Sequence, residues 1–275
     1  MAESKKFKSA EDLVFSDDFM FCKIMQDESI CKGVIERLLK IKIDRIEYPE
    51  IQKALTPLYD KKSIRFDVYV ASSDRILDVE MQSYTEKNLG KRTRYYQSLL
   101  DMDNLLKGQH YSELKESFVI FLCLYDPFEK GLPVYSFDRV CKENTDIDLQ
   151  DATHHIFFNC NAFEKEEDAE LKAFLSYVKS NTAESNFTRR IEEMVQSKKF
   201  EQTFLNEYMA IKLHESDIER RAMAAGREQG LEEGRAEGIT EGTTNAAVGM
   251  LKLGVPIETV AQGTGLSVEY LKTLV

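Results

Sequence analysis

Three acids stand at polar positions of one short stretch, IRFDVYVASSDRILDVEMQ: Asp67, Asp78 and Glu80. Carboxylates that converge on one point are the groups that proteins use to hold a hard divalent cation. In this stretch apolar and polar residues alternate on both sides of a short polar break. That period of two predicts a β-hairpin with strands at residues 64–70 and 76–82.

The turn of the predicted hairpin sets which residues face each other. With Ser73-Asp74 at its centre, Asp67 faces Glu80, and a slip of one residue would exchange the two faces. The polar face then carries Arg65, Asp67, Tyr69, Asp78, Glu80 and Gln82, and the apolar face carries Phe66, Val68, Val70, Leu77, Val79 and Met81.

Two carboxylates at directly opposite positions lie about 5 Å apart at Cβ and repel each other. A cation between Asp67 and Glu80 would remove that conflict. Mg²⁺ and Mn²⁺ fit best, because they accept one or two carboxylates and keep other positions for water and phosphate. The alternative is a solvated polar face on which water screens the repulsion, and the hairpin alone favours that interpretation.

Several further elements are needed to hold this hairpin. The segment FSDDFMFCKIMQDESICKGVIERLLKI predicts two short helices with Ser29 as an N-cap, and residues 43–56 predict a short strand and a connection. A long helix is expected in YTEKNLGKRTRYYQSLLDMDNLLKGQ, with Tyr95, Leu99, Met102 and Leu106 on one face. The apolar run at 117–126 predicts a strand buried on both faces in parallel pairing, and residues 154–163 predict another strand.

The character of the chain changes after residue 164. Residues 1–164 are expected to form the core, 165–242 a charged helical region, and 243–275 a small helical tail. In the tail, Ala261 and Gly265 have helix-turn-helix spacing, which we interpret as a packing or oligomerisation element rather than a DNA reader. Five glycines recur every fourth residue before it, and they indicate either a close helix–helix contact or, as we prefer, a solvated helix: Gly226, Gly230, Gly234, Gly238 and Gly242.

Composition narrows the class of protein. The chain has 275 residues, 43% of them apolar, and a net charge of −11, which argues against a surface coated with positive charge. It has no apolar run of membrane-spanning length, so no membrane partner is expected. Five cysteines are scattered without a CxxC pair, which predicts reduced thiols and a cytoplasmic protein.

The order of helix, strand, hairpin, helix and buried strand resembles the αβββαβ core of the PD-(D/E)XK nucleases. Local sequences extend the resemblance over nearly the whole chain: SDDFMFCKIM, RFDV with DVEMQ, RTRYYQSLL with KGQHYSELK, and the glycine-rich tail that ends in LGVPIETVAQGTGLSVEYL. In this combination and order they resemble the Rpn family of recombination-promoting nucleases and transposases.

The resemblance implies an α/β restriction-endonuclease-like fold, with a mixed sheet flanked by helices and an α-helical C-terminal region. It implies that Asp67 and Glu80 are the metal-binding acids, and that Gln82 stands where the superfamily usually has lysine. An acid on the first helix would complete the site, Asp18 in preference to Glu36, and the basic position on the following helix matches Arg92, with Arg94 as the competitor.

The implied function is a Mg²⁺-dependent DNA endonuclease, with Mn²⁺ as an alternative ion. Two groups of basic residues could bind the DNA phosphates: Lys61, Lys62 and Arg65, and Lys87, Lys91, Arg92 and Arg94. The alternative is that they are solvated charges of a turn and a helix. Because glutamine carries no charge at position 82, a weak or inactive nuclease-fold DNA-binding or adaptor protein of a mobile element is the alternative. A homo-oligomer through the C-terminal helices is a further expectation.

Overall fold

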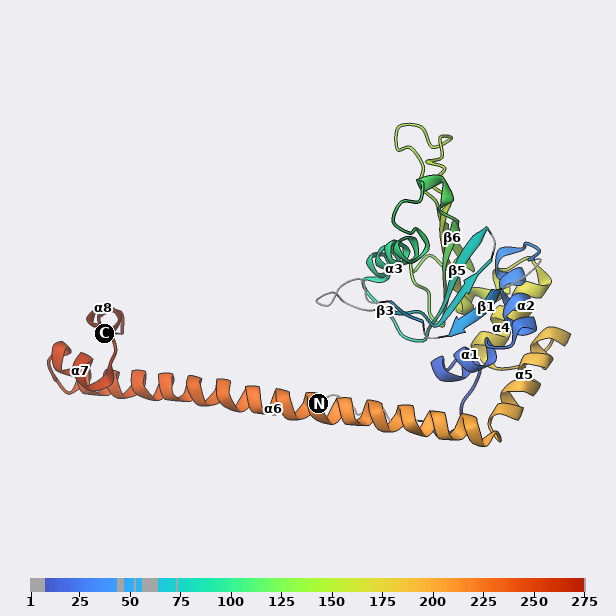
Figure 1. Ribbon diagram of the computed structural model, residues 1–275. Helices are drawn as coiled ribbons and strands as arrows, with labels where there is room; N and C mark the ends of the chain where they lie inside the picture. The colour runs from blue at the N-terminus through green and yellow to red at the C-terminus, as the bar shows by residue number, and fades with distance from the viewer. Residues whose placement is uncertain (1–7, 44–46, 52, 56–63, 73, 275) are drawn as a thin grey trace. The chain divides into compact units, whose positions relative to one another are not determined.

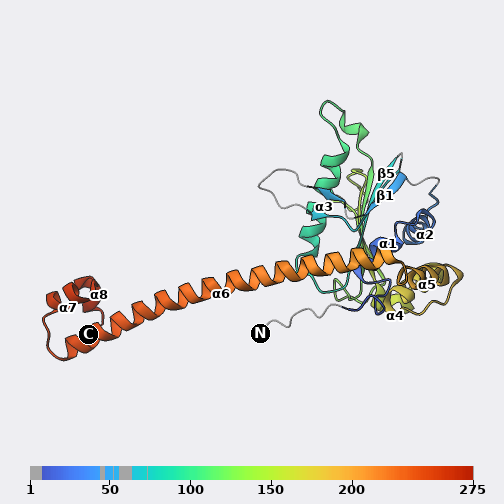
Figure 2. The same ribbon diagram turned by 60° about the horizontal axis from the view of Figure 1, so that its bottom comes forward.

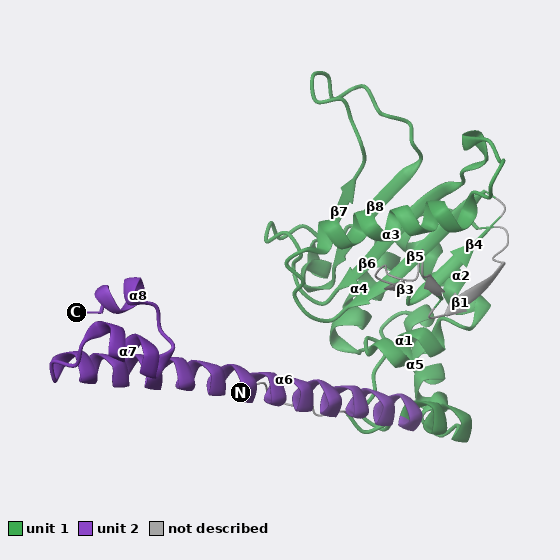
Figure 3. Cartoon of the chain, turned by 60° about the vertical axis from the view of Figure 1, so that its left-hand side comes forward, with its two compact units in different colours: residues 1–208 green, residues 209–275 purple. Residues whose placement is uncertain are grey.

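The structure is a computed structural model that describes residues 8–43, 47–51, 53–55, 64–72 and 74–274. Contacts divide the chain into two compact units, Met1–Tyr208 and Met209–Val275 (Figure 3). The first unit therefore extends beyond the expected core boundary at residue 164.

A six-stranded mixed sheet forms the centre of the first unit. Its strand order is β1-β4-β5-β6-β8-β7, with β1 Glu47–Ile51, β4 Val68–Ala71, β5 Arg75–Gln82, β6 Glu116–Cys123, β8 Thr153–Asn159 and β7 Val134–Phe137. The strand β5 pairs antiparallel with β4 and parallel with β6, and β6 pairs parallel with β8. A separate two-stranded sheet joins β2, Ala54–Leu55, to β3, Ile64–Arg65. A strand lies within each predicted range, but the expected strand at 64–70 is divided between β3 and β4, and the one expected at 154–163 ends at Asn159. The strand β7 was not expected.

Helices cover both faces of the sheet (Figures 1 and 2). One face packs against α3, Leu89–Asn104, through a cluster that includes Tyr69, Tyr96 and Phe121. The other face packs against α1 Asp18–Ile24, α2 Glu28–Leu39, α4 Ala169–Ser180 and α5 Asn186–Lys198. Two 3₁₀ helices lie at Tyr111–Glu113 and Cys160–Lys165. The sheet is therefore the middle layer of three.

Two expectations about the helices are wrong. The N-cap of α2 is Asp27, whose side chain accepts a hydrogen bond from the amide of Ile30, while Ser29 lies within the first turn and donates to Asp27. The helix α3 ends at Asn104, before Leu106, and Met102 and Leu106 are 62% and 69% exposed. The helix instead buries a face that contains polar residues: Leu89, Thr93, Tyr96, Gln97, Leu99 and Leu100.

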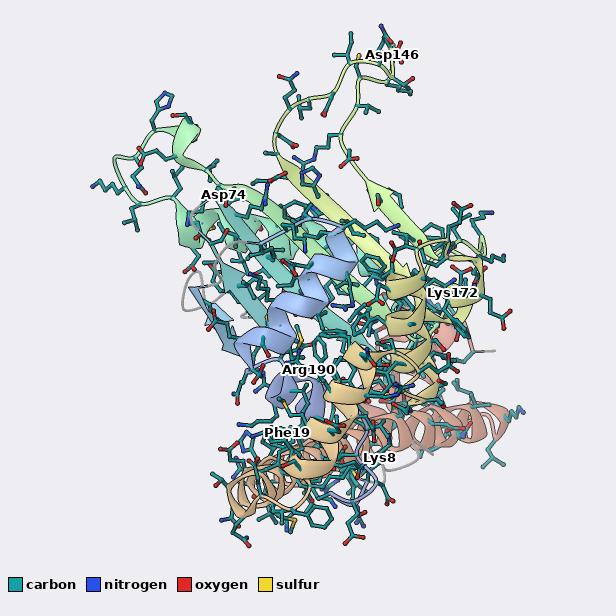
Figure 4. All side chains as sticks on the ribbon, turned by 90° about the vertical axis from the view of Figure 1, so that its right-hand side faces the viewer. Lys8, Phe19, Asp74, Asp146, Lys172 and Arg190 are labelled. Atoms are coloured by element: carbon teal, nitrogen blue, oxygen red, sulfur yellow. The ribbon has the colours of Figure 1, made fainter. Side chains whose placement is uncertain are left out.

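The two ends of the sheet are easily distinguished in Figure 4. Asp74, beside the turn between β4 and β5, and Asp146, in the long β7–β8 connection, lie at one end. Phe19 of α1 lies at the other end, where β5 finishes at Gln82. Arg190 of α5 donates to the Ser29 hydroxyl of α2 at 3.0 Å, which joins two helices of the same layer.

The second unit is helical. It contains most of α6, Gln202–Lys252, followed by α7 Ile257–Thr264 and α8 Val268–Lys272, which pack around Ala247, Val260 and Leu271. Gly265 ends α7 with φ +72°, a left-handed conformation that favours glycine, and so makes the predicted turn. The five regularly spaced glycines of α6 are exposed, and open space surrounds each of them.

Candidate active site

The register of the hairpin brings the acids of β5 to the α3 side of the sheet. Val68 pairs with Val79 and Tyr69 with Asp78, as the alternation predicts, although Ser73 of the expected turn lies outside the described residues. The β4 ladder begins at Val68, so position 67 belongs to a bend and not to the regular strand.

Side-chain hydrogen bonds replace the ladder at this bend. The Oε1 atom of Glu80 accepts a hydrogen bond from the backbone amide of Asp67 at 2.9 Å. In return, Oδ2 of Asp67 accepts one from the backbone amide of Met81 at 3.0 Å. Each carboxylate is thus hydrogen-bonded to a backbone amide on the opposite side of the hairpin. These two bonds hold the acids next to each other.

The bend also changes the predicted sorting of side chains. Phe66 was expected on the apolar face opposite Met81, but it packs on the α3 side, with ring centroids 5.3 Å from Tyr96 and 6.1 Å from Tyr69. The polar face is not solvated, because α3 covers it. Glu80 is 1% exposed and Gln82 is 2% exposed.

Arg92 of α3 is the centre of a hydrogen-bond network above these acids. Its Nη2 donates to Oε2 of Glu80 at 2.7 Å, and its Nη1 donates to Oε1 of Gln82 at 2.9 Å. The Nε and Nη2 atoms also donate to the Tyr96 hydroxyl at 2.9 and 2.7 Å. The amide of Gln82 donates in turn to the carbonyl of Tyr84 at 2.7 Å.

Of the two candidate acids on the first helices, Asp18 is the one beside the bend. It begins α1, is exposed, and contributes to the raised pKa of Asp67 through its charge. The α1 helix reaches the bend through Cys22, whose Sγ donates to the carbonyl of Asp67 at 3.5 Å. Glu36 of α2 instead accepts a hydrogen bond from the amide of Ile43 at 3.0 Å.

The basic residues divide into one partly buried arginine, Arg92, and several exposed side chains. Arg94 is exposed on α3, away from the network that Arg92 makes. Lys87 and Lys91 are also exposed at the start of α3, and Arg65 is exposed at the end of β3. Lys61 and Lys62 lie outside the described residues.

The buried acids carry more negative charge than their surroundings neutralise. Burial, and then the charge of Glu80, raise the pKa of Asp67 well above its usual range. Burial also raises the pKa of Glu80, although Arg92 opposes the shift. Burial and the charges of Glu80 and Asp67 raise the pKa of Asp78, which is fully buried. Neither of its carboxylate oxygens accepts a hydrogen bond from the described residues, and its side-chain partner is the carboxyl group of Glu80, to which a protonated Asp78 can donate.

The donor set fits a small hard cation. Asp67 and Glu80 supply carboxylate oxygens, and Oδ1 of Asp67 accepts none of the hydrogen bonds made by the described residues. Over the same residues there is no cluster of three or more His, Cys, Asp or Glu side chains that could hold a metal. Mg²⁺ needs only one or two carboxylates when water and phosphate complete its shell. A soft metal that demands several protein ligands does not fit.

Tyr96 is the member of this network that was not anticipated. It lies four residues after Arg92, so the two side chains are neighbours on the helix surface. That spacing could have identified Tyr96 as a neighbour of Arg92 from the sequence. The adjacent Tyr95 was assigned to the packing face instead, and it is only partly buried.

Comparison with known proteins identifies the family of the chain. A family model described as PD-(D/E)XK nuclease family transposase matches residues 10–231, which include every candidate site residue. A search of the curated proteins and a search of the solved structures gave no match. Among the helices that the structure describes, none combines the length and apolar character that a membrane span requires.

Proposed function

The chain belongs to the PD-(D/E)XK nuclease family transposases, and from this premise we propose that it is a Mg²⁺-dependent DNA endonuclease of recombination or transposition. The expected family and the α/β fold class are confirmed. One observation carries the proposed activity: at the bend, Glu80 accepts a hydrogen bond from the amide of Asp67 and Asp67 accepts one from the amide of Met81, while Glu80 is paired with the guanidinium of Arg92.

In the proposed site, Asp67 and Glu80 would hold Mg²⁺, and the main-chain carbonyl near Met81 would be a further ligand. Mn²⁺, which accepts the same oxygen donors, would serve as well. When bound, the ion polarises the scissile phosphate and lowers the pKa of a coordinated water. Asp18, exposed at the start of α1, is the third acid at the rim.

Arg92 and Gln82 have different proposed roles. Arg92 carries the positive charge that position 82 lacks, and it stabilises the negative charge that develops on the phosphate. Gln82 is neutral and cannot act as a base near neutral pH. Because its Oε1 accepts from Arg92 and its amide donates to Tyr84, its proposed role is to orient the arginine.

DNA is the proposed partner, and the exposed cations near the start of α3 would contact its backbone. Lys91 and Arg94 are exposed on α3, the helix that carries Arg92, and Lys87 is exposed just before it. They form a local positive surface on a chain whose net charge is −11. Each such contact should make DNA affinity more dependent on salt.

A second candidate function rests on the ion pair itself. Oε2 of Glu80 is bound to Arg92, so a metal that used this oxygen would have to displace the guanidinium. A protein in which that exchange fails would be a DNA-binding or adaptor protein of a mobile element with little or no nuclease activity.

Supercoiled plasmid incubated with purified protein and either Mg²⁺ or EDTA separates these functions. We expect nicking or linearisation only with Mg²⁺, loss of activity in Asp67→Ala and Glu80→Gln, and a reduced rate in Gln82→Ala. Circular dichroism of each variant checks that it is folded. DNA binding without cleavage would favour the second candidate, and full cleavage by Asp67→Ala would refute the assignment of the site.

The proposal includes the oligomeric state of the protein and its cellular location. We propose a homo-oligomer through the C-terminal helices, because the exposed glycines of α6 leave room for the close approach of a second copy. Light scattering on the full chain would test it, and a monomeric mass would refute it. A cytoplasmic location fits five free cysteines, four of which are buried.

A further inference from the structure

The hydrogen bonds that Arg92 makes with the described residues use all but one of its N–H donors. A guanidinium has five N–H groups. Within the described structure, four of them are used: Nε and one N–H of Nη2 by Tyr96, the other N–H of Nη2 by Glu80, and one N–H of Nη1 by Gln82. One N–H of Nη1 remains, on a side chain that is 30% exposed.

We propose that Tyr96 is a positioning residue of the active site, which fixes Arg92 so that this last N–H is presented to a phosphate oxygen of the substrate. The inference rests on the proposed nuclease function. It assigns to Tyr96 a role in the reaction, and to Arg92 a single donor for the phosphate.

The hydroxyl of Tyr96 is well suited to this role because its own position is fixed. The side chain is 5% exposed, its ring meets Phe66 edge to face at 5.3 Å, and it lies 6.2 Å from Phe121. Two donors of Arg92, on Nε and on Nη2, converge on the one oxygen. This pair of bonds prevents the planar guanidinium from rotating about its stem.

The hydrogen bonds of Arg92 to Glu80 and to Gln82 are less constant than those to Tyr96. Glu80 is a proposed metal ligand, so its pairing with Arg92 weakens when the cation takes the same carboxylate. Gln82 is held through the exposed Tyr84 segment, by a single hydrogen bond to a main-chain carbonyl. Tyr96 is not a proposed metal ligand, so on this proposal its contact with Arg92 is kept when the cation binds.

The test is Tyr96→Phe, which removes one oxygen and keeps the ring packing. Tyr69→Phe is the matched control, since its hydroxyl bonds Asn104 of the same helix and its ring lies in the same cluster. We expect Tyr96→Phe to lower the single-turnover rate constant at saturating DNA by about ten-fold or more. The DNA dissociation constant should change by less than about three-fold, and Tyr69→Phe should keep the wild-type rate within about two-fold.

Two further measurements separate positioning from a general structural role. The Nε–H signal of Arg92 in a ¹⁵N spectrum, identified by its absence from Arg92→Lys, should exchange with water faster in Tyr96→Phe than in the wild type. In an Arg92→Lys background, Tyr96→Phe should have little additional effect on the rate.

The outcomes distinguish this inference from the function on which it rests. A wild-type rate in Tyr96→Phe, an equal loss in the Arg92→Lys background, or unchanged exchange of the Nε–H would overturn it. If the wild type cleaves no DNA, the proposed function fails. The exchange measurement then still decides whether Tyr96 anchors Arg92.

Discussion

Replacing Asp78 with asparagine should stabilise the metal-free protein at neutral and higher pH. Asp78 is 0% exposed, and when it is ionised neither of its oxygens accepts a hydrogen bond from the described residues. An unsatisfied buried polar group costs about 1–3 kcal/mol, and more when it is charged. Asparagine has nearly the same shape, has no charge, and carries an amide that can donate to Glu80. We therefore expect the free energy of unfolding to rise by at least about 1 kcal/mol at pH 8.

The raised pKa of Asp78 determines how the stability of the wild type changes with pH. Burial, followed by the charges of Glu80 and Asp67, raises the pKa of Asp78 in the folded protein. Between the unfolded and the folded pKa values, the folded state retains a proton that the unfolded state releases, so stability falls as pH rises. One such group contributes a slope of up to about 1.4 kcal/mol per pH unit. The advantage of Asp78→Asn should be absent below the unfolded pKa and should grow as the pH rises.

Urea unfolding in EDTA at several pH values measures this difference. Asp126→Asn is a control of opposite sign, because its carboxylate accepts hydrogen bonds from three backbone amides and from Tyr135, which hold its pKa low against the effect of burial. That variant should be less stable than the wild type at pH 8. The reasoning about Asp78 would be refuted by an Asp78→Asn variant that is less stable at pH 8, or whose advantage does not change with pH.

Two other substitutions test how the helices are held. Gly33→Ala should cost about 1–3 kcal/mol in urea unfolding, because its methyl group would collide with the buried ring of Phe187. Gly226→Ala is the matched control on α6, where open space surrounds the position, and it should increase helicity instead. Asp27→Ala should cost about 1 kcal/mol by removing the N-cap of α2, whereas an unchanged unfolding midpoint would show that the cap is dispensable.

The hairpin register was predictable because two independent rules fix it. The period of two assigns each residue to a face, and the turn fixes the pairing, so Tyr69 and Asp78 lie opposite each other as expected. Both rules apply only to regular strands. The bend at position 67 breaks the alternation, and this is why Phe66 lies on the unexpected face.

Polar residues in buried positions explain most of the other differences between the predicted and the observed structure. The buried face of α3 includes Thr93, bonded to the carbonyl of Leu89, and Gln97, bonded to Ser117 of β6. A search for apolar spacing passes over such a face and selects the exposed Met102 instead. On α4 the frequent charges conceal a strongly apolar side, whose residues Leu171, Phe174, Leu175, Tyr177 and Val178 belong to the main core.

The candidate site also combines residues that the sequence could place with residues whose contacts depend on tertiary packing. The proximity of Asp67 and Glu80 could be derived from the register, whereas the contact between Arg92 and Glu80 depends on how α3 lies across the sheet. Tyr96 completes the network through a hydroxyl whose direction is a tertiary property. Sequence spacing alone can place two residues on one helix face, but it does not say what that face covers.

Binding of Mn²⁺ measured by titration calorimetry tests the central claim most directly, with Asp67→Asn beside Asp78→Asn. Both variants make the same carboxyl-to-amide change in one hairpin, and only Asp67 is proposed to touch the metal. We predict that the wild type and Asp78→Asn bind the ion and that Asp67→Asn loses at least about ten-fold in affinity. Wild-type affinity in Asp67→Asn would contradict the proposed metal centre.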